Sequence, residues 1–323
     1  MREFGFELHV CALLERDDEA VVARQLGGGV HSARRVLDVV CVEPGPNFDE
    51  RVAITPETIP AAAIESEVGT GQARYWRDAF DGRSDHIREV VDRAVELGFF
   101  ERERRGSRDY VRQSCRYPTD WFGQLVAIEN KPDLGTPGDL EMQLRKDVQL
   151  GLVDEVVLAT ESYVTGAHLN RIPEEVGVWR VDTESATRAV IREPMPLPVA
   201  EPGVEIVQTH AGRTDVRIAS ATAKARARRA LAERAYGKGW RTYDFPGCAR
   251  AAETTLAESG CVPYCDWHER VVDPGSECGQ DCPGFEAADP LDVAVAAERE
   301  QQTPWVADPD GRARRQSGLD QFF

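Results

Sequence analysis

One short stretch of the chain, residues 35–42 (RVLDVVCV), is almost entirely apolar and β-branched, yet it carries an aspartate, Asp38, in its middle. An apolar strand without polar alternation is typical of a strand that is covered on both faces. A carboxylate inside such a strand is costly unless it is paired or binds a metal ion. The stretch therefore predicts a buried sheet with a polar site built into it.

Predicted strands and helices alternate along much of the chain. A helix is predicted over 3–16, with apolar residues at three- and four-residue steps, and a second helix over 139–150. Further strands are predicted over 21–26, 124–131, 155–160 and 177–181. This alternation indicates the α/β fold class.

Changes in composition divide the chain into segments. Residues 1–55 and 115–193 carry most of the alternating elements and form the predicted core. The segment 56–114 is predicted to be an insertion, in which a helix over 85–97 and a hairpin turning at Arg105-Gly106-Ser107 resemble a winged-helix module. The remaining segments are a linker with a basic helix (194–245), a Cys-rich metal-binding region (246–286) and a flexible tail (287–323).

The charge balance indicates a protein adapted to high salt. The chain has 56 acidic and 39 basic residues, a net charge of −17, and only four of the basic residues are lysine. An acidic surface stays soluble when concentrated salt screens its self-repulsion, so the chain is interpreted as haloarchaeal. Nucleic acid would then bind through local basic patches, because high salt suppresses affinity that comes from counterion release.

Two further features bear on location. No apolar run approaches the roughly 18 residues that span a bilayer, which argues against an integral membrane protein. The first residues, Met1-Arg2-Glu3-Phe4, do not form a basic leader followed by an apolar stretch. We therefore expect a cytoplasmic protein without a membrane partner.

Three charged residues carry the main functional hypothesis: Asp38, Glu129 and Lys131. Glu129 and Lys131 are two residues apart near the end of the strand predicted over 124–131, so they share one face of it. Carboxylates on neighbouring strands can hold a hard divalent cation such as Mg²⁺. A lysine beside them can position or help to deprotonate a water bound to the metal, and the metal would stabilise charge on a phosphate that is being cleaved.

An aspartate in one strand and Glu-x-Lys in the next, followed by a helix and a strand, resembles the PD-(D/E)XK nuclease superfamily over residues 1–182. The resemblance implies a restriction-endonuclease-like fold and DNA cleavage that depends on Mg²⁺ or Mn²⁺. It also implies that Asp38 and Glu129 are metal ligands and that Lys131 is the catalytic lysine.

The same resemblance extends to two helix residues. It implies that Glu7 completes the metal site, with Glu15 as the competing acid, and that Gln143 is the glutamine that often follows on the next helix. The whole chain also resembles an uncharacterised haloarchaeal protein family. One alternative is a fold that keeps these residues but binds DNA without cutting it. Another is that Glu129 and Lys131 are a charge pair on an edge strand and that the helix residues are simply exposed.

Two basic patches are candidates for contact with DNA phosphates. The predicted DNA contacts are Lys224, Arg226, Arg228 and Arg229 on the basic helix, and Arg102 and Arg105 on the hairpin. Glu101 and Glu103 are interleaved with the hairpin arginines, so mutual ion pairing is the alternative there.

Five of the eight cysteines are clustered near the C-terminus, with the spacing C-x12-C-x3-C-x12-C-x3-C. They are Cys248, Cys261, Cys265, Cys278 and Cys282. In a cytoplasmic chain such clustering favours metal over disulfides. Two C-x3-C pairs fit a tetrahedral Zn²⁺ site, and His268 is a further candidate ligand. Pro283 after the last cysteine also suits a 4Fe-4S cluster, as several RecB-like nucleases have.

The chain ends in QSGLDQFF, in which Gln316, Leu319, Phe322 and Phe323 match Q-x-x-hydrophobic-x-x-aromatic-aromatic. This motif resembles the PCNA-interacting peptide of replication and repair proteins. A short helical turn would place one leucine and two phenylalanines in a single apolar pocket. The sequence thus predicts a metal-dependent DNA nuclease recruited by PCNA; the alternatives are an inactive PCNA-tethered DNA-binding adaptor and a metal-binding regulator with a winged helix.

Overall fold

The computed structural model describes residues 2–32, 34–136, 138–258 and 260–311. It contains two compact units. The first unit comprises Met1–Pro44 and Gly123–Trp305, and the second comprises Gly45–Phe122 with the described residues from Val306 on. The insertion predicted over 56–114 lies inside the second unit.

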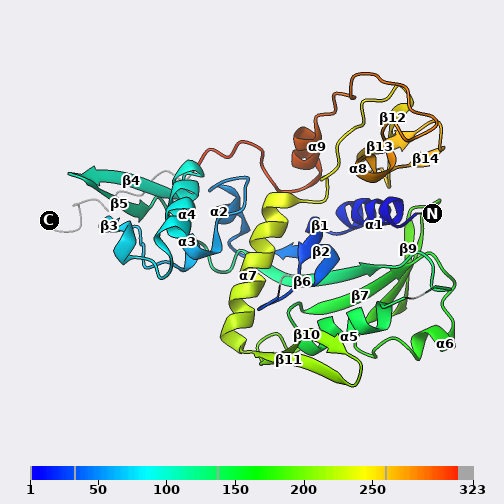
Figure 1. Ribbon diagram of the computed structural model, residues 1–323, viewed down its shortest axis with the longest axis horizontal. Coiled ribbons are helices and arrows are strands. Elements are labelled where there is room, and N and C mark those ends of the chain that lie inside the picture. Colours follow the sequence, from blue (N-terminus) through cyan, green and yellow to red (C-terminus); the bar gives the residue numbers. More distant parts are fainter. Residues whose placement is uncertain (1, 33, 137, 259, 312–323) are drawn as a thin grey trace. The chain divides into compact units, whose positions relative to one another are not determined.

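A six-stranded mixed sheet organises the first unit, with the strand order β1-β2-β6-β7-β8-β9 (Figure 1). Strands β1 and β2 form an antiparallel hairpin, β6, β7 and β8 run parallel, and β9 returns antiparallel to β8. The bounds are β1 (Val21–Gly27), β2 (Val36–Pro44), β6 (Phe122–Asn130), β7 (Glu155–Thr160), β8 (Gly177–Asp182) and β9 (Thr187–Arg192). The predicted α/β class is confirmed at this level.

Helix α1 (Glu3–Asp17) is buried on nearly all sides. Its residues share one core with sheet residues such as Val39 and Ile128, and with Trp240 and Tyr243 from the C-terminal part of the unit. A helix covered by two layers does not need a polar face, because little of it meets water. This explains why the apolar residues of α1 are spread around the helix.

Two other long helices belong to this unit. Helix α5 (Leu140–Leu150) packs on β7 and on β10 (Gly203–His210), and it ends where Gly151 adopts a left-handed φ of 54°. Helix α7 (Ala221–Lys238) packs on β1 and β2. It begins at Ser220, whose side chain accepts a hydrogen bond from the backbone N–H of Ala223, a common N-terminal cap. The short helix α6 (Gly166–Leu169) precedes β8.

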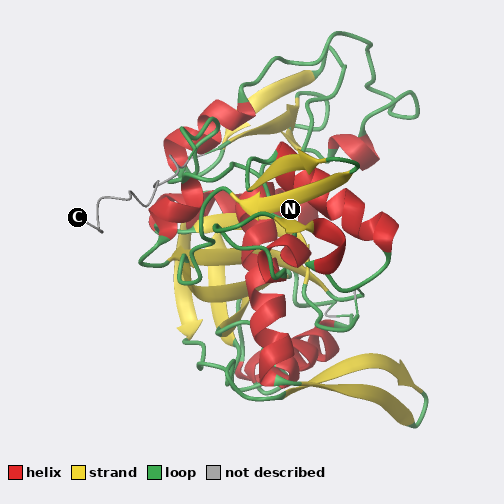
Figure 2. Ribbon diagram, turned by 90° about the vertical axis from the view of Figure 1, so that its left-hand side faces the viewer, coloured by secondary structure: helices red, strands yellow, loops and turns green. Residues whose placement is uncertain are grey.

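Strand β10 and β11 (Arg213–Ala219) form a hairpin that extends away from the large sheet at the bottom of the view (Figure 2). The sequence analysis placed only a linker in this region, because the proline-rich break at 194–202 precedes it. Many side chains of the hairpin are exposed, including Val216 in the middle of β11 and Ile218 near its base. Few apolar residues of this segment are buried, so its strand pattern was weak.

The Cys-rich region forms a small three-stranded sheet in the order β12-β13-β14. Its elements are β12 (Ala251–Thr255), β13 (Cys261–Cys265), β14 (Arg270–Val271) and helix α8 (Pro274–Glu277). Helix α9 (Val295–Gln302) follows in a segment that was predicted to be flexible. Arg299 is buried on α9 and its guanidinium lies 4.2 Å from the ring centroid of Trp305, which gives this polar helix an attachment that its composition does not reveal.

The second unit has its own small sheet, in the order β3-β5-β4, and a helix directly before the hairpin. Its core includes Phe99, Phe100 and Val111. The elements are α2 (Phe48–Val52), α3 (Ala61–Glu65), β3 (Arg74–Tyr75), the 3-10 turn Trp76–Asp78, α4 (Ser84–Glu96), β4 (Phe100–Arg105) and β5 (Arg108–Gln113). The helix and hairpin predicted here are both present. Among the described residues, no helix has the length and apolar character needed to cross a membrane.

Candidate functional site

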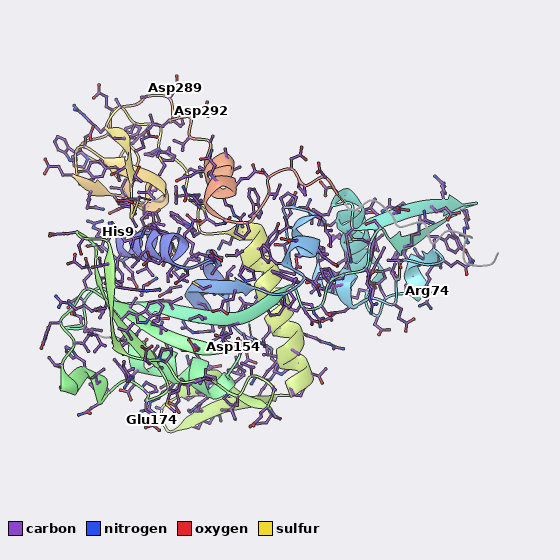
Figure 3. The ribbon with its side chains drawn as sticks, turned by 180° about the vertical axis from the view of Figure 1, so that it is seen from behind. His9, Arg74, Asp154, Glu174, Asp289 and Asp292 are labelled. Carbon is purple, nitrogen blue, oxygen red and sulfur yellow. The ribbon has the colours of Figure 1, made fainter. Side chains whose placement is uncertain are left out.

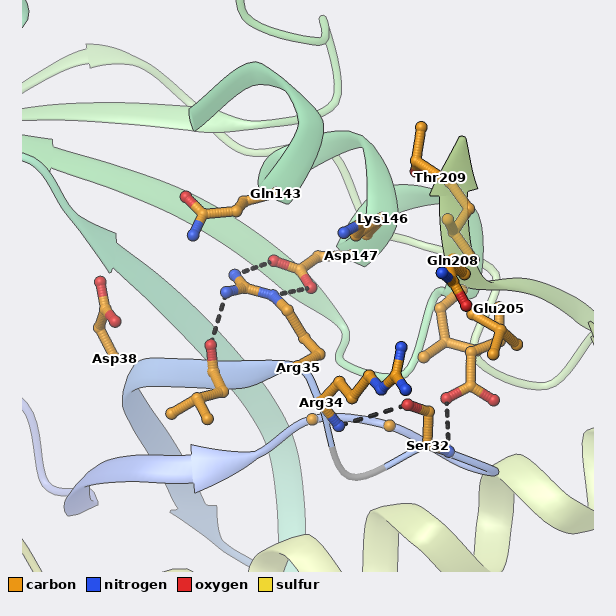
Figure 4. Close-up of a pocket in the computed structure, with 16 residues that line it drawn as sticks. Ser32, Arg34, Arg35, Asp38, Gln143, Lys146, Asp147, Glu205, Gln208 and Thr209 are labelled. Carbon is orange, nitrogen blue, oxygen red and sulfur yellow. Dashed lines mark hydrogen bonds and ion pairs between the residues drawn. The ribbon is translucent and has the colours of Figure 1, made fainter. Parts of the chain in front are cut away.

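A polar cavity of about 500 Å³ lies in the first unit, between the loop that leads into β2, helix α5 and strand β10 (Figure 4). Its lining carries both signs of charge. The cations are Arg34, Arg35 and Lys146, and the carboxylates are Asp38, Asp147 and Glu205. The cationic side chains could bind anionic groups of a ligand, and the carboxylates could bind a cation or a proton donor.

Asp38 and Glu129 lie on neighbouring strands, β2 and β6. Asp38 Oδ2 accepts a hydrogen bond of 2.9 Å from the backbone N–H of Asn130, the residue after Glu129. Burial and the nearby Asp38 raise the pKa of Glu129 to about 7, against the opposing effect of Arg35. Burial also raises the pKa of Asp38. The two carboxyl groups therefore share one partly desolvated site.

Arg35 is the cation that balances these carboxylates. Its Nη2 donates to Glu129 Oε2 at 2.7 Å and to Asp147 Oδ2 at 2.6 Å, and its Nε donates to Asp147 Oδ1 at 2.8 Å. Figure 4 shows the guanidinium pointing at Asp147 on α5. Arg35 is thus held by two bonds on Asp147 and by one bond on Glu129.

The sequence analysis missed both Arg35 and Asp147. A signal for Asp147 was present, because it continues the buried stripe of α5 formed by Leu140, Leu144 and Leu150. A charged residue in an apolar stripe indicates a buried ion pair or a site. Arg35 had no comparable signal, since the strand RVLDVVCV simply begins with it.

The other predicted site residues differ in their relation to the cavity. Gln143 lines the cavity with Asp38. Lys131 follows β6, is half-buried and is not among the lining residues, whereas Lys146 is. Glu7 is buried, pairs with Arg24 and accepts a 2.7 Å hydrogen bond from Gln25. Within the described parts of the chain, no three His, Cys, Asp or Glu side chains converge as a group that could hold a metal ion.

A second feature of the cavity wall is the loop after β1. Three successive backbone N–H groups, those of Val30, His31 and Ser32, donate to the Glu205 carboxylate at 3.1, 2.8 and 3.1 Å. A Cβ on Gly29 would lie 1.9 Å from the Ser32 carbonyl oxygen, so the loop requires glycine there. Nothing in the sequence pattern singles out Glu205 as the carboxylate that this loop surrounds.

The basic helix α7 is less exposed than predicted. Lys224 is fully buried, and its Nζ donates to the carbonyl oxygens of Pro198 and Glu201 at 2.9 Å each. Arg228 donates to the Leu152 carbonyl oxygen and to Asp154, which Figure 3 labels. These two residues attach α7 to neighbouring loops. Arg226 is exposed and Arg229 is half-buried.

Acidic neighbours accompany the hairpin arginines of the second unit. Arg102 pairs with Asp92 on α4, and Arg105 pairs with Glu103 at 3.0 Å. The Arg105 guanidinium also lies 4.7 Å from the ring centroid of Tyr110. Ion pairing within the hairpin, the alternative considered from the sequence, is therefore present.

Four of the five clustered cysteines gather in one neighbourhood. Burial raises the pKa of the Cys278 thiol, and the nearby Cys265, Cys248 and Cys282 raise it further. Cys261 is apart from them, where its Sγ donates to Glu253 Oε2 at 3.2 Å. The predicted PCNA-binding residues Gln316, Leu319, Phe322 and Phe323 lie outside the described residues.

The model of a family of unknown function, DUF5787, matches residues 21–287. The chain belongs to this family. The range matched by DUF5787 includes the cavity residues and all five clustered cysteines, but not α1. No curated protein and no solved structure matches the chain, and the DUF5787 family itself carries no assigned activity.

The raised pKa of Glu129 predicts how the stability of this DUF5787 protein depends on pH without added metal. Between the ordinary carboxyl pKa of 4.5 and the folded value of about 7, folded Glu129 holds a proton that the unfolded chain has released. The free energy of unfolding should therefore fall as pH rises through this window. Urea unfolding of wild type and Glu129→Gln measures the effect.

Glu129→Gln should flatten the pH dependence, because glutamine does not titrate. Glu141→Gln is the matched control, since Glu141 is an exposed residue on α5 that pairs with Arg145. Equal slopes for wild type and Glu129→Gln across this window would contradict the assignment.

Proposed function

We propose that the chain is a metal-dependent DNA nuclease. The observation that carries the proposal is the pair of carboxylates, Asp38 and Glu129, on neighbouring strands beside a polar cavity. Asp38 accepts a hydrogen bond from the residue next to Glu129, and each carboxyl group has a raised pKa. Two buried carboxyl groups that lie close together do not readily ionise at the same time. A divalent cation between them would stabilise the doubly ionised form.

The arrangement of elements supports this proposal. Within the first unit, helix α1, hairpin β1–β2, strand β6, helix α5 and strand β7 occur in this order, with the second unit inserted between β2 and β6. Asp38 lies on β2 and Glu129 on β6. This is the order implied by the resemblance to PD-(D/E)XK nucleases. Gln143, implied by the same resemblance, lines the cavity beside Asp38 (Figure 4).

Arg35 would act as the counter-ion that leaves when a cation binds. It holds Asp147 through two hydrogen bonds and Glu129 through one. It can therefore release Glu129 and remain attached to α5. A bound Mg²⁺ or Mn²⁺ would supply an activated water and stabilise charge on the phosphate. Arg34 and Lys146 line the cavity and would attract the DNA backbone.

Lys131 keeps the role of catalytic lysine in this proposal. It lies two residues beyond Glu129 and is only half-buried. Its role would be to orient the attacking water, for which an amine is suited because it can lose its proton, unlike a guanidinium. Lys146 on α5, which does line the cavity, is the matched comparison.

A second candidate function is an inactive DNA-binding adaptor. Two observations favour it: Arg35 forms an ion pair with Glu129, and Glu7 interacts with Arg24 and Gln25. The second unit could supply DNA binding in either case. Its strand order β3-β5-β4, with α4 directly before the hairpin, suits the winged-helix resemblance.

Cleavage assays separate the two functions. Purified full-length protein is incubated in concentrated KCl with flap, junction, single-stranded and duplex DNA, with Mg²⁺, Mn²⁺ or EDTA. The nuclease proposal requires cleavage that EDTA abolishes. DNA binding without cleavage of any substrate in either metal would instead support the adaptor.

Recruitment by PCNA is part of the proposal and rests on residues 316–323 of the sequence. We expect a peptide of these residues to bind the host's PCNA in concentrated KCl, because apolar contacts are not screened by salt. Replacing Phe322 or Phe323 by alanine should weaken binding by at least about 2 kcal/mol, as for buried aromatic anchors. Calorimetry measures this, and equal binding by wild-type and double-alanine peptides would show that the match is accidental.

A further inference from the structure

The small C-terminal sheet of the first unit contains a group of thiols that the nuclease proposal does not use. Cys248 precedes β12, Cys265 ends β13, and Cys278 and Cys282 bracket the turn after α8. Few apolar side chains of this region are buried; among them are Val262, Val271 and Val272. Val262 and Val271 join the core around α1, whereas the turns that carry the thiols bury little apolar surface, so a metal cross-link would stabilise those turns.

Backbone pairing places the turn that carries Cys248 beside the strand that carries Cys265. Cys265 is the register partner of Ala251 across β12 and β13, and the backbone N–H of Asp266 donates to the carbonyl oxygen of Arg250 at 2.9 Å. The turn from Cys248 to Ala251 is closed by a 2.9 Å hydrogen bond between these two residues. Cys248 therefore sits one tight turn from the strand position opposite Cys265.

A second set of contacts brings in the other two thiols. The turns that follow Cys278 are closed by hydrogen bonds of 3.0 Å from Cys282 N–H to the Gly279 carbonyl and from Phe285 N–H to the Cys282 carbonyl. A Cβ on Gly284 would lie 2.3 Å from Cγ of Trp267. This turn therefore packs directly on the indole of the loop that leaves Cys265.

Cys248 and Cys282 also have partners of the kind that surround metal-bound sulfur. Cys248 Sγ accepts hydrogen bonds of 3.5 Å from the backbone N–H groups of Arg250 and Glu286. Cys282 Sγ lies 3.7 Å from Nε2 of His268. Donors aimed at a sulfur stabilise its thiolate form and orient a ligand.

Cys261 lies outside this arrangement. It pairs in register with Thr255, at the opposite end of the β12–β13 ladder from Cys265. Its thiol donates to Glu253, and its carbonyl oxygen accepts from the Tyr243 hydroxyl at 2.7 Å. These contacts hold Cys261 away from the other four cysteines, which leaves four candidate metal ligands.

We propose that Cys248, Cys265, Cys278 and Cys282 form a structural Zn²⁺ site, with His268 positioning Cys282 and Cys261 playing no part. Four thiolates match the closed tetrahedral set of structural zinc. The four thiols are neighbours but do not yet form a converged ligand group. The backbone contacts already fix the turns that carry these thiols, and the ion would cross-link them.

Metal analysis of the full-length protein and matched Cys→Ser variants tests this assignment. Wild type and Cys261→Ser should each carry one zinc ion per chain, whereas Cys278→Ser and Cys282→Ser should lose it. His268→Ala should keep zinc but bind it about 10–100-fold more weakly, the usual effect of removing a positioning partner. X-ray absorption should show sulfur ligands at about 2.3 Å.

A second measurement covers variants that fail to fold. Wild type stripped by a chelator is titrated with Co²⁺, and the absorption bands of tetrahedral cobalt–thiolate should appear and then vanish when Zn²⁺ is added. Iron with a brown chromophore, zinc loss in Cys261→Ser as large as in Cys278→Ser, or wild type without metal and without cobalt bands would each overturn the proposal. None of these outcomes depends on nuclease activity.

Discussion

Replacing Asp38 by asparagine is expected to reduce metal-dependent DNA cleavage by more than about 100-fold. Loss of even a second-shell partner of a bound metal costs about 10–100-fold, and Asp38 is proposed as a direct ligand. Asparagine keeps an oxygen that can accept the hydrogen bond from the Asn130 N–H, so the fold should survive. DNA affinity in EDTA should change little, because no phosphate-binding cation is removed.

Single-turnover cleavage and DNA binding in EDTA are measured for Asp38→Asn, Glu129→Gln, Lys131→Ala and Lys146→Ala. Glu141→Gln, on the exposed side of α5, is the charge-matched control and should behave as wild type. Lys131→Ala should lose cleavage and retain binding, whereas Lys146→Ala should weaken binding. If Asp38→Asn cut DNA as fast as Glu141→Gln, the metal site would have to lie elsewhere.

Replacing Glu15 by alanine is expected to lower the free energy of unfolding by about 3–5 kcal/mol, the usual effect of breaking a buried ion pair. Glu15 on α1 accepts hydrogen bonds of 2.7 and 2.6 Å from Arg241 and one of 3.0 Å from the Trp240 indole. Its side chain is 1% exposed and that of Arg241 is 2% exposed. Alanine would leave a buried guanidinium without its bidentate partner.

Urea unfolding in concentrated KCl measures this effect, since salt does not screen a buried pair well. Asp17→Ala provides the control on the same helix, because Asp17 pairs with Arg16 near the surface and such pairs contribute about 0–1 kcal/mol. The double variant Glu15→Leu/Arg241→Met should lose less than Glu15→Ala, because both charges of the pair are removed and the remaining partner of Arg241, Glu298, is 19% exposed and can be hydrated. A loss for Glu15→Ala no larger than for Asp17→Ala would show that the pair is not buried in solution.

The sequence was sufficient to predict five of the six strands of the large sheet and the helices α1, α4 and α5, but it did not predict strand β9. It was insufficient for hairpin β10–β11 and helix α9, which bury little apolar surface of their own. Helix α9 depends instead on Arg299 and Trp305, a contact between residues whose types alone do not predict it.

The candidate site was predicted in part, for a related reason. Asp38 and Glu129 were identifiable because a charge in a buried strand is conspicuous. Their partner Arg35 and the loop around Glu205 were not, because an arginine at a strand end and a glycine turn occur in many surfaces. The prediction for Lys224 was wrong, because a lysine on a basic helix is expected to be exposed. Its burial depends on the carbonyl oxygens of Pro198 and Glu201, which the sequence pattern does not indicate.

The enclosure of α1 has a consequence for how the chain reaches its native state during synthesis. Part of the covering of this helix, from Trp240 to Val271, follows it by more than 200 residues in the chain and is therefore made later. Until then its apolar surface has only the sheet to cover it, and contacts so distant in sequence form slowly. A nascent chain that stops after α7 should therefore expose apolar surface and bind chaperones, and synthesis of the segment up to Val271 should release it.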